Sequence, residues 1–91
     1  MVSGKIVILS ELGLHLRPAG ILCNLAINFP CNIELRTDNR TVNAKSVIGV
    51  LSACIKHHDE VELICDGERE EEAFTALSKL LVSNFDNHTK E

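Results

Sequence analysis

Residues 60–67 read EVELICDG, and their apolar side chains fall mainly at every second position. Val61, Leu63 and Cys65 alternate with polar residues, which is typical of a strand with one buried and one solvated face. The glycine at the end of this stretch breaks the strand. Helical spacing then predicts a final helix over residues 68–84. Its inward residues are Ala73, Phe74, Leu77, Leu80 and Leu81.

The residues before this last strand and helix show the same two patterns, alternating apolar residues and apolar residues at helical spacing. Apolar or alternating runs predict strands at residues 5–9, 33–37 and 40–43, the last two joined by a two-residue turn. Apolar residues at helical spacing predict helices over residues 16–28 and directly after Ser46. The order β-α-β-β-α-β-α predicts an α+β fold, an open-faced β-sandwich with a four-stranded, mostly antiparallel sheet. Three helices cover one face, and charged strand residues occupy the other.

Length and composition limit what such a fold can do. The 91 residues contain no linker or repeat, so we expect a single domain over residues 1–91 with a frayed tail at residues 86–91. Hydrophobic residues make up 45%, which excludes a disordered chain, and the net charge of -4 argues against nucleic-acid binding. No apolar run approaches the roughly 20 residues of a membrane span, and residues 1–9 do not resemble a signal peptide. We therefore expect a cytoplasmic protein without membrane insertion.

Four cysteines bear on the compartment and on metal binding. They are Cys23, Cys31, Cys54 and Cys65. One interpretation is that the chain is secreted and that its four cysteines form two disulfides. Because all but the second cysteine fall on the apolar side of an expected element, we favour reduced, partly buried thiols. A small metal or redox protein is a further alternative. His57 and His58 match no zinc-ligand spacing, so we expect a solvated polar turn and no metal site there.

Residues 13–20, GLHLRPAG, place a histidine and an arginine at the expected start of the first helix. His15 lies beside backbone N–H groups that the helix leaves unpaired, at the positive end of its dipole, where anions bind. Arg17 adds a permanently charged fork that suits phosphate oxygens. The positive surroundings disfavour imidazolium, so we expect a neutral, nucleophilic His15 near pH 7. These residues fit a phosphohistidine carrier; the alternative is a helix-capping histidine beside a solvated arginine.

The stretch around His15 resembles the active-site signature of the HPr family, the histidine phosphocarriers of the bacterial phosphoenolpyruvate:sugar phosphotransferase system. Residues 43–51, NAKSVIGVL, are similar to the regulatory-serine segment of that family, and the chain length and element order also match. The resemblance implies that His15 accepts a phosphoryl group on Nδ1 from Enzyme I and passes it to an Enzyme IIA. It implies that Arg17 balances the phosphate charge. It describes a carrier without cofactor or metal, not an enzyme.

The same resemblance assigns a regulatory and a docking role to other residues. It implies phosphorylation of Ser46 by an ATP-dependent HPr kinase/phosphorylase, with a transcriptional regulator as a further partner, whereas the residues alone predict an N-cap. A phosphate there would place a dianion on the docking surface without unfolding the helix. The family docks partners through an apolar patch. The matching positions are Leu16, Gly20, Ile21, Val47, Ile48 and Leu51.

Two departures from the family pattern bear on partner choice. Leu16 stands where a small or hydroxyl residue is usual, and Gly20 stands where Thr, Ser or Ala is common. Leu12 and residues 82–86 resemble the nitrogen-related paralogue NPr, so the sequence leaves the HPr and NPr branches open. The alternative function is a regulatory signalling module that does not support sugar transport. We expect a monomer, because a carrier presents one open face to successive partners.

Overall fold

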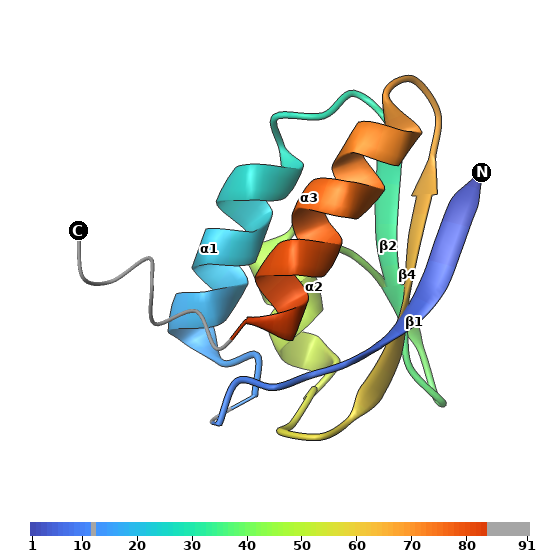
Figure 1. Ribbon diagram of the computed structural model, residues 1–91. Helices are drawn as coiled ribbons and strands as arrows, with labels where there is room; N and C mark the ends of the chain where they lie inside the picture. Colours follow the sequence, from blue (N-terminus) through green and yellow to red (C-terminus); the bar gives the residue numbers. More distant parts are fainter. Residues whose placement is uncertain (12, 84–91) are drawn as a thin grey trace.

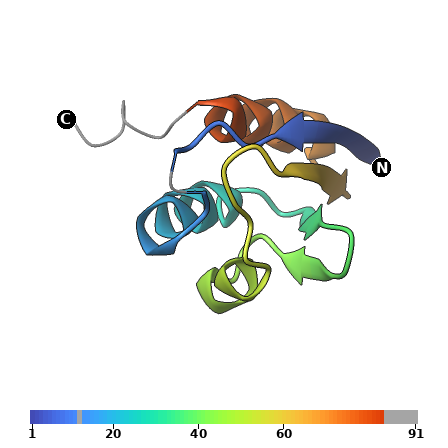
Figure 2. The same ribbon diagram turned by 90° about the horizontal axis from the view of Figure 1, so that it is seen from below.

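A computed structural model describes residues 1–11 and 13–83 of the chain. These residues form four strands and three helices, which are β1 (Val2–Val7), α1 (Leu16–Ala26), β2 (Asn32–Arg36), β3 (Thr41–Asn43), α2 (Val47–Ser52), β4 (Glu60–Asp66) and α3 (Glu70–Val82). The strands lie in the order β1-β4-β2-β3 with antiparallel neighbours. The helices cover one face of this sheet (Figures 1 and 2). The predicted open-faced α+β sandwich and its element order are confirmed.

Strand β4 has the bounds and the two faces that its alternation predicts. Its side chains on the helix-covered face are buried, namely Val61, Leu63 and Cys65. On the opposite face, Glu62 accepts a hydrogen bond from Arg36 on β2 over 3.1 Å. This largely exposed ion pair is worth about 1 kcal/mol or less, so register depends mainly on the buried face. Ile64, although on the open face, is also buried.

Strand β1 begins earlier than the apolar run predicts. It pairs with β4 from Val2 opposite Cys65 to Val7 opposite Glu60, whereas the prediction covered residues 5–9. Gly4 lies inside the strand, and the Phe74 ring of α3 packs directly over it. A Cβ on Gly4 would lie 2.9 Å from the ring, so the close approach of α3 requires glycine there.

Helix α3 begins two residues later than predicted. Arg69 precedes it in the left-handed conformation, with φ of 63°, and this residue ends the turn after β4. Glu70 accepts hydrogen bonds from the Gly67 amide at 2.9 Å and the Met1 amino group at 3.0 Å. These contacts, the Gly67 bond first, lower the pKa of Glu70. The predicted inward face is confirmed, with Phe74 half-buried. The predicted helix end at residue 84 and the tail at residues 86–91 lie outside the described residues.

The cysteines are free thiols, and the prediction for one of them was wrong. Cys23, Cys31 and Cys65 are buried, and burial raises the pKa of the Cys65 thiol to about 11. Burial also raises the pKa of Cys23, so both thiols are protonated at neutral pH and unreactive. Cys54, predicted to face the core, is exposed because α2 ends at Ser52 and Cys54 follows with φ of 55°. None of the helices formed by the described residues is long and apolar enough to cross a membrane.

Candidate functional site

The segment that leads into α1 is held in place by a tight backbone contact at Gly13. Gly13 has φ of 72°, its amide donates to the Ser10 carbonyl at 3.0 Å, and the Ser10 hydroxyl donates back to the Gly13 carbonyl at 3.1 Å. The Leu14 amide donates to the Ile55 carbonyl at 3.0 Å. A Cβ on Gly13 would collide with that same carbonyl oxygen and lie 2.8 Å from the Cα of Lys56. Only glycine satisfies both the conformation and the space.

His15 follows this segment as the N-cap of α1, in extended conformation with φ of -84° and ψ of -164°. Its carbonyl accepts the Ala19 amide at 2.9 Å and closes the first turn. Its imidazole is exposed and makes no capping hydrogen bond within the described part of the chain. The amides of Leu16 and Arg17 precede the first helical bond, and Pro18 has none. The geometry therefore leaves an accessible imidazole beside two amides that the helix does not use.

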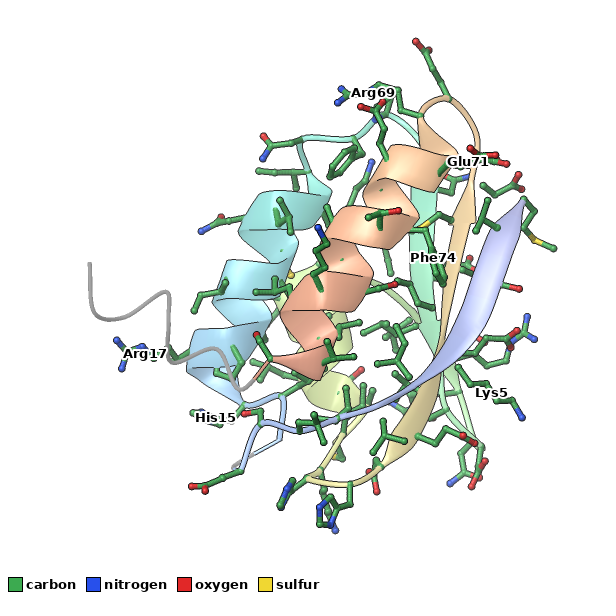
Figure 3. All side chains as sticks on the ribbon, viewed as in Figure 1. Lys5, His15, Arg17, Arg69, Glu71 and Phe74 are labelled. Carbon is green, nitrogen blue, oxygen red and sulfur yellow. The ribbon has the colours of Figure 1, made fainter. Side chains whose placement is uncertain are left out.

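Arg17 lies at the same end of α1 as His15, and both side chains project away from the body of the molecule (Figure 3). The first turn of α1 contains no acidic residue. Among the described residues no carboxylate forms an ion pair with Arg17. Its guanidinium is therefore available to an incoming anion.

Ser46 caps α2 as predicted. Its hydroxyl accepts the Gly49 amide at 3.0 Å. Two long-range hydrogen bonds that the sequence did not reveal also hold this helix. In the first, the Lys45 ammonium donates to the Phe29 carbonyl, after α1, at 2.6 Å. Arg40 donates to the carbonyl of the last residue of α2 at 3.0 Å. Long-range contacts of this kind have no local sequence signal. They join the residue before Ser46 to the segment after α1, and the end of α2 to the turn between β2 and β3.

Helices α1 and α2 pack against each other and carry the predicted docking residues on their outer sides. The Leu16 and Ile48 side chains are the most exposed of these, at 68% and 78%. Ile21, Val47 and Leu51 are half-buried against the core. Gly20 has open space around it, since an added Cβ there meets no atom within 4 Å. Apolar side chains are therefore exposed on both of these packed helices, and Leu16 directly follows His15 in the chain.

The structure places His57 and His58 in the turn between α2 and β4, exposed as predicted. Their rings stack with centroids 3.7 Å apart. Within residues 1–11 and 13–83, no three histidine, cysteine or acidic side chains gather in a way that holds a metal ion.

A family model described as "PTS HPr component phosphorylation site" matches residues 2–83 of the chain. The chain belongs to the HPr family. It is 37% identical over 82 residues to the phosphocarrier protein HPr of Lysinibacillus sphaericus, covering 90% of this chain and 93% of that protein. It is also 37% identical over 78 residues to the HPr-like protein Crh of Bacillus subtilis, covering 86% and 92%. The resemblance seen in the sequence is thereby confirmed.

The fold agrees with this family assignment. The crystal structure of an HPr from Thermoanaerobacter tengcongensis superimposes with a TM-score of 0.89 at 39% identity, covering 93% of this chain and 96% of that one. HPr proteins are phosphocarriers of the bacterial phosphotransferase system.

Proposed function

We propose that the chain accepts a phosphoryl group on His15 from phosphorylated Enzyme I and passes it to an Enzyme IIA component. The observation that carries this proposal is the exposed His15 imidazole at the N-cap of α1, free of capping bonds to the described residues and beside Arg17. In the first transfer, a P–N bond forms on Nδ1 while the bond from phosphorus to the donor atom of Enzyme I breaks. The bonding electron pair leaves with the donor. The second transfer reverses these roles, with His15 as the leaving group.

The surroundings of His15 stabilise the phosphoryl group once it is attached. The Arg17 guanidinium and the amides of Leu16 and Arg17 are donors for phosphate oxygens, at the positive end of α1. Hydrogen bonds to a charged group contribute about 1.5–3 kcal/mol each. The exposure of His15 suits a carrier, because the same phosphate must reach a donor and then an acceptor.

The apolar side chains exposed on α1 and α2 supply the docking face for both partners. Leu16 and Ile48 are large, exposed and apolar, and such residues next to a reactive group mark an interaction site. Because Enzyme I and Enzyme IIA use the same face in turn, we propose that the chain acts as a monomer and leaves this face open.

A phosphorylation assay tests the proposal. Incubation with phosphoenolpyruvate and the Enzyme I of the same genome is expected to add one phosphoryl group per chain, seen as a shift in intact mass. The phosphate should be lost in acid, as a P–N bond is, and should pass to an Enzyme IIA when one is added. An unchanged mass, or a phosphate that survives acid, would contradict the proposal.

A second candidate function is a regulatory module that supports no sugar transport. The similarity to the HPr-like protein Crh favours it. In that case the phosphorylation states of His15 and Ser46 change only the affinity for kinases or transcriptional regulators. Transfer from His15 to any Enzyme IIA would then be undetectable, and the genome would lack sugar-specific Enzyme II components.

We further propose that Ser46 is phosphorylated by an HPr kinase/phosphorylase and that the added charge, on the docking face, slows transfer. Ser46→Ala is expected to lose the cap to Gly49 and about 1 kcal/mol of stability, with near-normal transfer from Enzyme I. Ser46→Asp keeps a capping oxygen, so we expect stability within about 0.5 kcal/mol of the native chain but transfer slowed about tenfold.

Urea denaturation and the initial rate of His15 phosphorylation measure the two effects of Ser46 substitution. The alanine and aspartate variants serve as controls for each other, because one removes the cap and the other adds the charge. Equal slowing by both would show that cap geometry, not charge, governs docking.

A further inference from the structure

The segment between β1 and α1 is held against the chain before β4 by backbone hydrogen bonds near both of its ends. At its start, the Ile8 amide donates to the Asp59 carbonyl at 2.9 Å, and the Ile8 carbonyl accepts the His58 amide at 2.8 Å. At its end, the Leu14 amide donates to the Ile55 carbonyl at 3.0 Å. Any residue except proline can make these bonds, because they use only main-chain atoms.

Ser10 contributes the one side-chain hydrogen bond that the structure describes within residues 8–11 and 13–15. Among the described residues it is the only polar or charged one that is buried, with 5% of its surface exposed. Its hydroxyl donates to the Gly13 carbonyl at 3.1 Å, and its carbonyl accepts the Gly13 amide at 3.0 Å. Because a buried hydroxyl is costly unless it is hydrogen-bonded, this bond fixes the Ser10 side chain as well as its partner.

The peptide group between Gly13 and Leu14 is thereby held at both of its polar atoms. Its carbonyl oxygen accepts the Ser10 hydroxyl, and its N–H donates to the Ile55 carbonyl. The carbonyl and the N–H of a trans peptide group point in opposite directions within one plane. Two bonds on opposite sides of this plane therefore oppose its rotation.

The orientation of this peptide group bears on His15, which begins one residue later. The Leu14 side chain is buried, with 3% of its surface exposed, so it cannot turn freely to absorb a tilt of the preceding peptide. Such a tilt passes to the next peptide group and so to the Cα–Cβ bond of His15. Phosphoryl transfer needs the reacting atoms in line, and a misplacement of about 1 Å costs about 100-fold in rate. A change at Ser10 therefore reaches the imidazole through the backbone.

We propose that Ser10 is a positioning residue for phosphoryl transfer, and that its hydroxyl holds the His15 imidazole in its reactive orientation by fixing the Gly13–Leu14 peptide group. This role rests on the proposed function and adds to it a residue that acts through Gly13 and Leu14 without touching the phosphate. Ser10→Ala removes the donor from the buried Gly13 carbonyl and leaves the main-chain bonds of the segment in place.

Single-turnover kinetics test the proposal. Phosphorylated Enzyme I of the same genome is mixed with increasing concentrations of this chain, which gives the maximal rate of transfer and the half-saturating concentration. For Ser10→Ala we expect the maximal rate to fall about 3- to 10-fold, because His15 is misplaced in the complex. The half-saturating concentration should stay within about twofold of the native value, since the exposed Leu16 and Ile48 are unchanged.

Two further variants control for the hydroxyl and for its place in the fold. Ser10→Thr keeps a hydroxyl at this position and is expected to recover most of the maximal rate. In the turn between β2 and β3, the Thr37 hydroxyl donates to the Arg40 carbonyl, also three residues further on, at 3.2 Å. Thr37→Val removes that bond and should leave both kinetic constants unchanged. All rates are measured at a temperature at which urea denaturation shows each variant to be folded.

Amide signals in nuclear magnetic resonance spectra report on the geometry without a partner. When His15 is phosphorylated, the Leu16 and Arg17 amide protons of the native chain should move downfield, because they donate to the phosphate. The shifts should be smaller in Ser10→Ala and native in Thr37→Val. A loss of stability alone does not change these shifts in the folded protein.

The outcomes separate the role of Ser10 from the function on which it rests. A Ser10→Ala chain with the native maximal rate and native amide shifts overturns the role of Ser10, while its phosphorylation on His15 leaves the proposed function standing. Equal slowing by Ser10→Ala and Thr37→Val, or a raised half-saturating concentration at the native maximal rate, also overturns that role. If the native chain accepts no phosphate from Enzyme I, the proposed function and the role of Ser10 are both overturned.

Discussion

Replacing His15 by serine or asparagine is expected to give a more stable protein that accepts no acid-labile phosphate from Enzyme I. The native imidazole occupies the N-cap of α1 without making a capping hydrogen bond to a described residue. Serine and asparagine rank among the best capping residues, so either should gain about 0.5–1 kcal/mol by accepting an amide of the first turn. Neither carries a nitrogen nucleophile of the imidazole type. Stability and function therefore change in opposite directions at this position.

Urea denaturation and intact-mass measurement check the two halves of this prediction separately. Asn24→Ala, an exposed change further along α1, serves as the matched control and should leave phosphorylation unchanged. Arg17→Ala should slow transfer by about 10- to 100-fold, the loss of one charge-assisted interaction, while the final level of phosphate stays the same. Acid-labile phosphate on the His15→Ser protein would move the acceptor elsewhere. A loss of stability in that protein would give His15 a structural role.

Features of the fold that depend on neighbouring residues could be predicted from the sequence. The alternation around Leu63 identified β4 with its bounds, and Ser46 was placed as a cap because capping involves residues only three apart. The errors have tertiary causes. Strand β1 begins at Val2 because the edge of β4 offers backbone partners from that point, whatever the local apolarity. Cys54 is exposed because α2 stops two residues before it, in a left-handed turn that no local pattern announces.

The candidate site shows the same difference between features set by neighbouring residues and features set by long-range contacts. His15 and Arg17 were found because nucleophile and cation lie within one short stretch at a helix start. The parts that position them come from far along the chain. The Ile55 carbonyl accepts the Leu14 amide before His15, and the Lys45 ammonium donates to the Phe29 carbonyl, which joins the segment before α2 to the segment after α1. No local sequence pattern reveals which group a lysine or a backbone carbonyl will contact. The sequence therefore identified His15 and Arg17 but not the contacts that position them.

Gly13→Ala should be the most damaging single change near the site, and Gly20→Ala should be stabilising, although both add one methyl group. At Gly13 the φ of 72° and the collision of a Cβ with the Ile55 carbonyl act together, so we expect a loss of about 2–4 kcal/mol. At Gly20, inside α1, an added Cβ meets nothing within 4 Å, and alanine should gain about 0.5–1 kcal/mol from helix propensity.

The two glycine variants also separate positioning of His15 from stability of the fold. The Gly13→Ala chain must move the segment before α1 away from Ile55, which displaces His15 relative to the docking face. Because transfer depends on the geometry of the reacting atoms, we expect phosphorylation by Enzyme I to slow about 10- to 100-fold even at temperatures where the variant is fully folded. Gly20→Ala should transfer at nearly the native rate. Urea midpoints together with initial rates measure both effects, and a Gly13→Ala protein with native stability and rate would refute the role assigned to this backbone contact.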